Sequence, residues 1–140
     1  MDDESGAVDE PVYLVTEDVL EIYAAIIDAS VTQAEDHLRS RAALEGALAR
    51  PGTHAHYQQA DLALQAAVLA HGIAETQPFI DGNKRTALVV MLTFLEINAY
   101  RVRATDPELA DWIIGFSRGT TPESLADRIR ERPTDAGGGR

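Results

Sequence analysis

Nine contiguous residues near the middle of the chain combine side chains suited to binding an anion and a metal ion. In order they are Gln77, Pro78, Phe79, Ile80, Asp81, Gly82, Asn83, Lys84 and Arg85. A long apolar pattern, expected to be a helix, starts immediately behind them. The first backbone N–H groups of a helix lack partners within it, and its dipole places positive charge at the same end. The sequence therefore predicts an anion site, with phosphate as the expected ligand.

Each residue type in this stretch has a physical reason to be there. Gly82 lets the backbone approach the anion without a Cβ, while Lys84 and Arg85 add positive charge, Arg85 with a planar fork that suits phosphate. Asp81 offers hard oxygen atoms beside the anion, as Mg²⁺ requires. Phe79 is expected to point inward and anchor the loop. The same string is also an ordinary turn, because Asp-Gly and Gly-Asn both form turns, so the residues alone leave Asp81 open between a metal ligand and a turn or cap residue.

Helix-period patterns surround this stretch on both sides and predict an all-α fold of about six helices. The segments are 16–27, 40–49, 61–73, 84–98, 105–116 and 122–129. Residues 84–98 are apolar on every side, which favours a central, buried helix. Thr16, Asp61 and Thr105 are the expected N-terminal caps of their segments, and Pro122 suits a first helical position. Polar loops are expected over 30–38 and 51–59, and residues 13–15 and 100–102 are candidates for a short pair of strands.

The bulk properties bound the class of protein. The chain has 140 residues, a formal net charge of −11 and no cysteine. One domain is expected over 12–132, with an acidic tail over 1–11 and a flexible tail over 133–140. The negative charge argues against broad nucleic-acid binding, and no apolar run reaches the ~18 residues of a membrane helix. Without cysteine or a signal peptide pattern, a cytoplasmic protein is expected.

The nine residues closely resemble the core motif of the Fic/Doc family, which reads His-x-Phe-x-Asp/Asn-Gly/Ala-Asn-Lys-Arg in its Doc (death-on-curing) branch. Further segments are similar to Doc-like proteins. They are Leu44 to Pro51, Lys84 to Ala87, Phe94 to Asn98, and Gly119 to Arg130. The resemblance therefore covers roughly residues 12–132, and it implies the Fic/Doc fold.

The resemblance also implies an activity and a set of roles. Doc-like toxins use ATP to phosphorylate a translation elongation factor and are restrained by a small antitoxin, whereas the Fic branch, which generally ends Asn-Gly-Arg, adenylylates proteins. By this likeness Asp81 would hold Mg²⁺, Gly82 and Asn83 would form the anion hole, and Lys84 and Arg85 would bind the nucleotide phosphates. The family's self-inhibitory motif, Ser/Thr-x-x-x-Glu-Gly/Asn, is out of register here, so an inhibitor would be a separate protein.

The chain departs from the motif at its first position, where Gln77 stands in place of the family's catalytic histidine. Glutamine does not titrate near neutral pH, so it cannot act as a general base, although it can still hold a hydroxyl group in place. Gln77, Asp81 and Arg85 are the expected catalytic positions of a Doc-like transferase with reduced activity. Three readings stay open: a natural low-activity or inactive variant that still binds a nucleotide or a partner, an engineered substitution, or different chemistry with another base.

The histidines considered for that base are weak candidates. His71 lies six residues before Gln77, near the end of the preceding helix, where a helix-end polar role is the expected one. His54 and His56 fall in the predicted loop 51–59, which could form a flap over the site. As a His-x-His pair they lack a nearby third metal ligand.

Overall fold

Seven α-helices account for most of residues 10–134, the part of the chain that the computed structural model describes. They are α1 (Thr16–Ile27), α2 (Val31–Asp36), α3 (Arg41–Gln58), α4 (Leu62–Thr76), α5 (Asn83–Ile97), α6 (Asp106–Ile114) and α7 (Pro122–Glu131). A 3₁₀ turn, η1 (Gly115–Arg118), continues α6. The predicted all-α class is confirmed.

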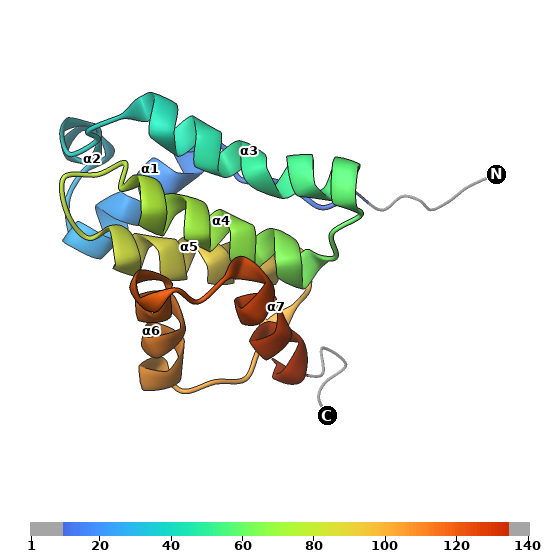
Figure 1. Cartoon of the computed structure of the whole chain (residues 1–140). Coiled ribbons are helices and arrows are strands. Elements are labelled where there is room, and N and C mark those ends of the chain that lie inside the picture. Colours follow the sequence, from blue (N-terminus) through green and yellow to red (C-terminus); the bar gives the residue numbers. More distant parts are fainter. Residues whose placement is uncertain (1–9, 135–140) are drawn as a thin grey trace.

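The helices pack around α4 and α5, which lie side by side in the middle of the molecule. Figure 1 shows α3 along one side of α4, with α1 behind and with α6 and α7 below. Helix α5 is central, as the sequence predicts, but α4 shares that position, because it has nine buried residues against six in α5. The loop between these two central helices lies at the end of the molecule where α2 packs against α1 (Figure 1).

Most helix-start signals in the sequence are confirmed. The side chain of Asp61 accepts the N–H of Leu64 at 3.0 Å and caps α4. Thr105 forms the expected capping box at the start of α6, and Pro122 is the first residue of α7. Thr16 is one position too late for a cap, because it is already helical and the residue before it is the N-cap.

Two predicted loops are wrong. Residues 31–36 form the short helix α2, whose N-cap Ser30 exchanges hydrogen bonds with Gln33. The predicted loop over 51–59 is instead the last two turns of α3, because this helix continues through Pro51. A proline inside a helix costs about 3 kcal/mol. Pro51 is buried in the packing of α3, and that burial offsets part of the cost.

The predicted strand at residues 100–102 is present, but its partner is not the predicted segment 13–15. β2 (Arg101–Val102) pairs antiparallel with β3 (Pro133–Thr134), and residues 13–15 form no strand. That segment is held by other contacts: the ring of Tyr13 stacks on Phe94, and the side chain of Asn98 binds the backbone of Val12. The predicted tails fall largely on residues 1–9 and 135–140, which lie outside the described residues.

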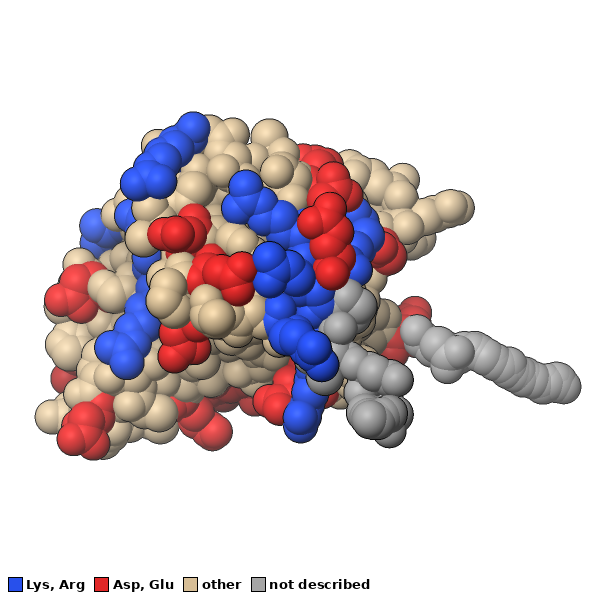
Figure 2. Space-filling view, turned by 90° about the horizontal axis from the view of Figure 1, so that it is seen from below, with Lys and Arg blue, Asp and Glu red and all other residues tan. Residues whose placement is uncertain are grey.

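Basic and acidic side chains lie close together on one face of the molecule. Figure 2 shows basic and acidic side chains interleaved on the lower face. Arg130 pairs with Asp61 and Asp127, and Arg132 pairs with Glu108. None of the helices in the described part of the chain has the length and apolar character needed to cross a membrane.

Candidate functional site

The loop between α4 and α5 is set by two residues in the left-handed backbone region. Gln77 has φ +49°, and its N–H closes α4 on the carbonyl of Ile73 at 3.0 Å. Gly82 has φ +73° and is the N-cap of α5, and its carbonyl accepts both the N–H and the hydroxyl of Thr86. Glycine adopts this backbone conformation without strain. The chain thus turns between the two central helices and presents the start of α5.

Phe79 anchors the loop, as the sequence predicts. Its ring is fully buried and lies flat on Tyr23 of α1, with ring centroids 3.9 Å apart and planes 3° from parallel. The Asn83 side chain closes the loop from the other direction. Its amide oxygen accepts the N–H of Phe79 at 2.9 Å, and its amide nitrogen donates to the Phe79 carbonyl at 2.9 Å. These contacts fix the loop on the core and on the first turn of α5.

The segment that joins α2 to α3 holds the outer side of the loop. The backbone N–H groups of Arg39 and Ser40 donate to the Pro78 carbonyl at 2.7 and 3.1 Å, and the N–H of Ile80 donates to the His37 carbonyl at 2.9 Å. The guanidinium of Arg39 also donates to the Gln77 carbonyl at 2.6 Å. Backbone and side-chain hydrogen bonds therefore hold the loop against the segment that joins α2 to α3.

An open cleft of about 360 Å³ lies over this loop and the start of α5. Its lining residues are Ala74, Gln77, Ile80, Asp81, Gly82, Asn83, Lys84 and Arg85. The structure thus brings together all six residues that the sequence singles out as catalytic, nucleotide-binding or metal-binding. The side chains of Gln77, Asp81, Lys84 and Arg85 are exposed there.

The geometry refines the role of Asn83. The side chain of Asn83 uses its amide oxygen and one amide hydrogen within the loop, while its backbone N–H lies with that of Gly82 at the start of α5, where an anion would bind. The N-terminal end of α5 adds its dipole, and Lys84 and Arg85 add full charges within the first turn. The arrangement suits a phosphate group lying on the helix end.

The carboxylate of Asp81 fits a divalent metal in part. It is exposed at the cleft, and one of its oxygens accepts the buried Tyr23 hydroxyl at 3.2 Å. Burial, and then the negative charge and hydrogen bond of Asp81, raise the pKa of Tyr23. No cluster of three or more acidic, histidine or cysteine ligands occurs among residues 10–134. A magnesium ion at Asp81 would therefore take its other ligands from phosphate oxygens and water, as Mg²⁺ commonly does.

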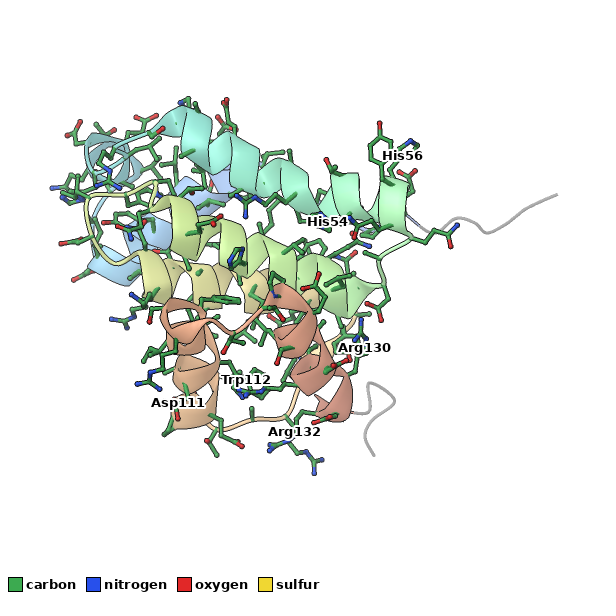
Figure 3. All side chains as sticks on the ribbon, in the orientation of Figure 1. His54, His56, Asp111, Trp112, Arg130 and Arg132 are labelled. Carbon is green, nitrogen blue, oxygen red and sulfur yellow. The ribbon has the colours of Figure 1, made fainter. Side chains whose placement is uncertain are left out.

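The histidines do not supply a base in the cleft. Figure 3 shows His54 and His56 at the C-terminal end of α3, at the opposite end of the molecule from the loop, so the predicted flap is wrong. His71 packs edge-on against Phe116, with its Nδ1 near the guanidinium of Arg50 at 3.5 Å. None of these three histidines lines the cleft.

Three residues that support the site were not identified as site residues from the sequence. Tyr23 and His37 lie behind the loop with their rings 5.9 Å apart, and Arg39 brings a further cation to Gln77. The Nδ1 atom of His37 is buried and has no hydrogen-bond partner in the described part of the chain. Of these three residues, the sequence could have pointed only to Tyr23, because a tyrosine on an apolar helix face needs a hydrogen-bond partner for its hydroxyl. The contacts of His37 and Arg39 with residues 77–80 are separated by about forty positions, and no local pattern shows them.

The comparisons with known proteins agree with this geometry. The family model described as "Fic/DOC family" matches residues 13–95, which is more than half of the chain. A comparison with curated proteins gave no match. Membership of the family implies a nucleotide-dependent transferase that modifies proteins. The matched region runs from the segment before α1 almost to the end of α5 and contains the whole cleft, and the chain belongs to the Fic/DOC family.

Proposed function

We propose that this protein is a transferase of the Doc branch, which moves a phosphoryl or nucleotidyl group from ATP to a hydroxyl group of a protein. The main support for the proposal is the cleft at the start of α5, whose lining includes Gln77, Asp81 and residues 82–85. Their Asn-Lys-Arg ending favours the Doc branch and phosphoryl transfer over the adenylylating branch.

The phosphate groups of the nucleotide are held by the chain's own dipoles and charges. The backbone N–H groups of Gly82 and Asn83 would donate to a phosphate oxygen at the helix end, and Lys84 and Arg85 would neutralise the charge that accumulates during transfer. Asp81 would hold Mg²⁺, which neutralises phosphate charge and orients the leaving group. Such positioning and charge stabilisation supply most of the catalysis in phosphoryl transfer.

Gln77 sets the expected rate. In the transfer, a bond forms between the target oxygen and phosphorus, and the bond from that phosphorus to the leaving phosphate oxygen breaks. The amide of Gln77 can hold the target hydroxyl, but it cannot take the proton, which then leaves to water or to a phosphate oxygen. A positioned base contributes about 10²–10⁴-fold. The protein is therefore a slow transferase, whose rate is lower by roughly this factor than that of an enzyme with a base at position 77.

The target and the regulator follow from the same resemblance. We propose a translation elongation factor as the protein substrate, and a small antitoxin, encoded in a neighbouring reading frame, as the inhibitor. The motif of self-inhibition is out of register at Ser40 to Gly46, which supports an inhibitor in trans. The interleaved charges of the lower face support a protein rather than a nucleic acid as the partner. A cytoplasmic location is proposed on the absence of cysteine.

Labelled ATP tests this function and its branch. The protein is incubated with Mg²⁺, a cell lysate and ATP labelled at either the γ- or the α-phosphate. Transfer of the γ-label to a protein supports phosphorylation, and transfer of the α-label supports adenylylation. Both signals should vanish in Asp81→Ala. No label on any protein, even after Gln77→His, would overturn the proposal.

The alternative is a catalytically inactive module that binds a nucleotide or a partner on the same scaffold. Gln77 is the observation that favours it, because the phosphate cradle is complete while the base is missing. Calorimetry with ATP and Mg²⁺ separates the alternatives. Binding that Asp81→Ala and Arg85→Ala weaken, without transfer by the Gln77→His variant, would support the module. No binding at all would leave only an interaction fold.

A further inference from the structure

One buried hydroxyl group reaches both the backbone and the side chain of Asp81. The Tyr23 Oη atom lies 3.1 Å from the Asp81 carbonyl oxygen and 3.2 Å from its Oδ1 atom. A phenol has a single hydrogen to donate, so the two acceptors share it. The Tyr23 hydroxyl therefore contacts both the carboxylate and the backbone carbonyl of Asp81.

The ring that carries this hydroxyl cannot move freely. Tyr23 has no exposed surface, one face of its ring is covered by Phe79 at 3.9 Å, and His37 approaches it edge-on. Helix α1 therefore projects a fixed donor at the loop that lines the cleft. Asp81 itself is exposed, and an exposed aspartate without such a contact samples several rotamers.

We infer that Tyr23 is the positioning residue of Asp81: its hydroxyl holds Oδ1 from behind, so that the rest of the carboxylate faces the cleft. This inference rests on the proposed role of Asp81 as the Mg²⁺ ligand. Partners that orient a ligating carboxylate contribute 10–100-fold to metal affinity in proteins. Tyr23 is not among the residues that line the cleft, and its hydroxyl reaches the cleft only through Asp81.

The test removes the hydroxyl and keeps the ring. Tyr23→Phe preserves the stack on Phe79, and Tyr13→Phe is the matched control. The hydroxyl of Tyr13 donates to the side chain of Gln65 at 2.8 Å, and its ring stacks on Phe94, but Tyr13 lies outside the cleft. Calorimetry with ADP at increasing Mg²⁺ concentration measures the concentration of Mg²⁺ that gives half of the full enhancement of binding.

That concentration should rise by about 10–100-fold in Tyr23→Phe. It should stay at the wild-type value in Tyr13→Phe, and ADP affinity without Mg²⁺ should be the same in all three proteins. An unchanged Mg²⁺ requirement in Tyr23→Phe would overturn the inference.

A second readout needs no ligand and separates this inference from the proposed function. Hydrogen exchange of the amides at 81–84 should be faster in ligand-free Tyr23→Phe than in wild type, and unaltered in Tyr13→Phe. If the wild-type protein shows no Mg²⁺-dependent binding, the proposed function fails, and exchange then decides whether Tyr23 orders Asp81. Equal exchange in wild type and Tyr23→Phe would overturn that ordering role.

Discussion

Removing the side chain of Asn83 should weaken nucleotide binding through the loop rather than through a lost contact to the ligand. Asn83→Ala deletes two hydrogen bonds to the backbone of Phe79, each 2.9 Å long. At about 0.5–1.5 kcal/mol per bond, the loss is about 1–3 kcal/mol of unfolding free energy. Alanine's better helix propensity offsets up to about 0.7 kcal/mol of this. Urea unfolding should therefore show a net loss of about 0.3–3 kcal/mol.

Asn98→Ala is the matched control. The side chain of Asn98 also bridges a backbone N–H and a carbonyl, those of Val12, at 2.8 and 3.0 Å, and it donates to the Phe94 carbonyl at 2.8 Å, all away from the cleft. Asn98→Ala should lower stability by a similar amount and leave the affinity for ADP with Mg²⁺ unchanged. Asn83→Ala should lower both.

Asn83→Asp separates support of the loop from charge in the cleft. The carboxylate still accepts the Phe79 N–H and interacts favourably with the helix dipole, by about 0.3–1 kcal/mol, but it loses the donor to the Phe79 carbonyl. It should therefore unfold closer to wild type than Asn83→Ala does, while its negative charge weakens ADP binding further. Wild-type stability in Asn83→Ala, combined with lost binding, would contradict the structural role and show that the side chain contacts the nucleotide directly.

Two further predictions concern the scaffold. A Cβ on Gly72 would lie 3.0 Å from the Cβ and 3.2 Å from the Cα of Ala47, whereas one on Gly46 would meet nothing within 4 Å. Urea unfolding should therefore show Gly72→Ala destabilised by about 1–2 kcal/mol and Gly46→Ala stabilised by about 0.5–1 kcal/mol; equal effects would show that α3 and α4 are not in close contact there. Hydrogen bonding to Arg130 lowers the pKa of Asp61 in the folded protein. The ion pair therefore stabilises the fold fully at pH values above the ordinary pKa of an aspartate, and this stabilisation is lost as the pH falls through the lowered pKa of Asp61. Asp61→Asn keeps the helix cap and should lower the free energy of unfolding by about 0.2–1 kcal/mol at pH 7. This difference from wild type should shrink below about pH 4, and a difference that does not depend on pH would contradict the pairing of Asp61 with Arg130.

The local features of the site could be predicted from the sequence because neighbouring residues in the chain determine them. The motif 77–85, the caps at Asp61 and Thr105, and the inward anchor Phe79 all follow from residue type and position, and the structure confirms the caps and the anchor. That six motif residues line one cleft also follows, since a loop leading into a helix presents its ends together.

The rest depends on packing between segments far apart in the chain. Pro51 predicts a helix end, yet burial keeps α3 helical beyond it. The support of the loop by Tyr23, His37 and Arg39 arises from tertiary contacts that no spacing in the sequence encodes. The use of the Asn83 amide inside the loop is likewise visible only in the structure, because the sequence shows an amide without its partner.

The rate of transfer from labelled ATP by the Gln77→His variant shows whether position 77 lacks the catalytic base. Gln77 is exposed at the cleft, and histidine tolerates its left-handed backbone, so the variant should fold like wild type. We expect a gain of about 10²–10⁴-fold that falls away as pH drops below about 6.5, with ADP affinity unchanged. High activity with Gln77, unchanged or lowered by histidine, would contradict the assignment of this position.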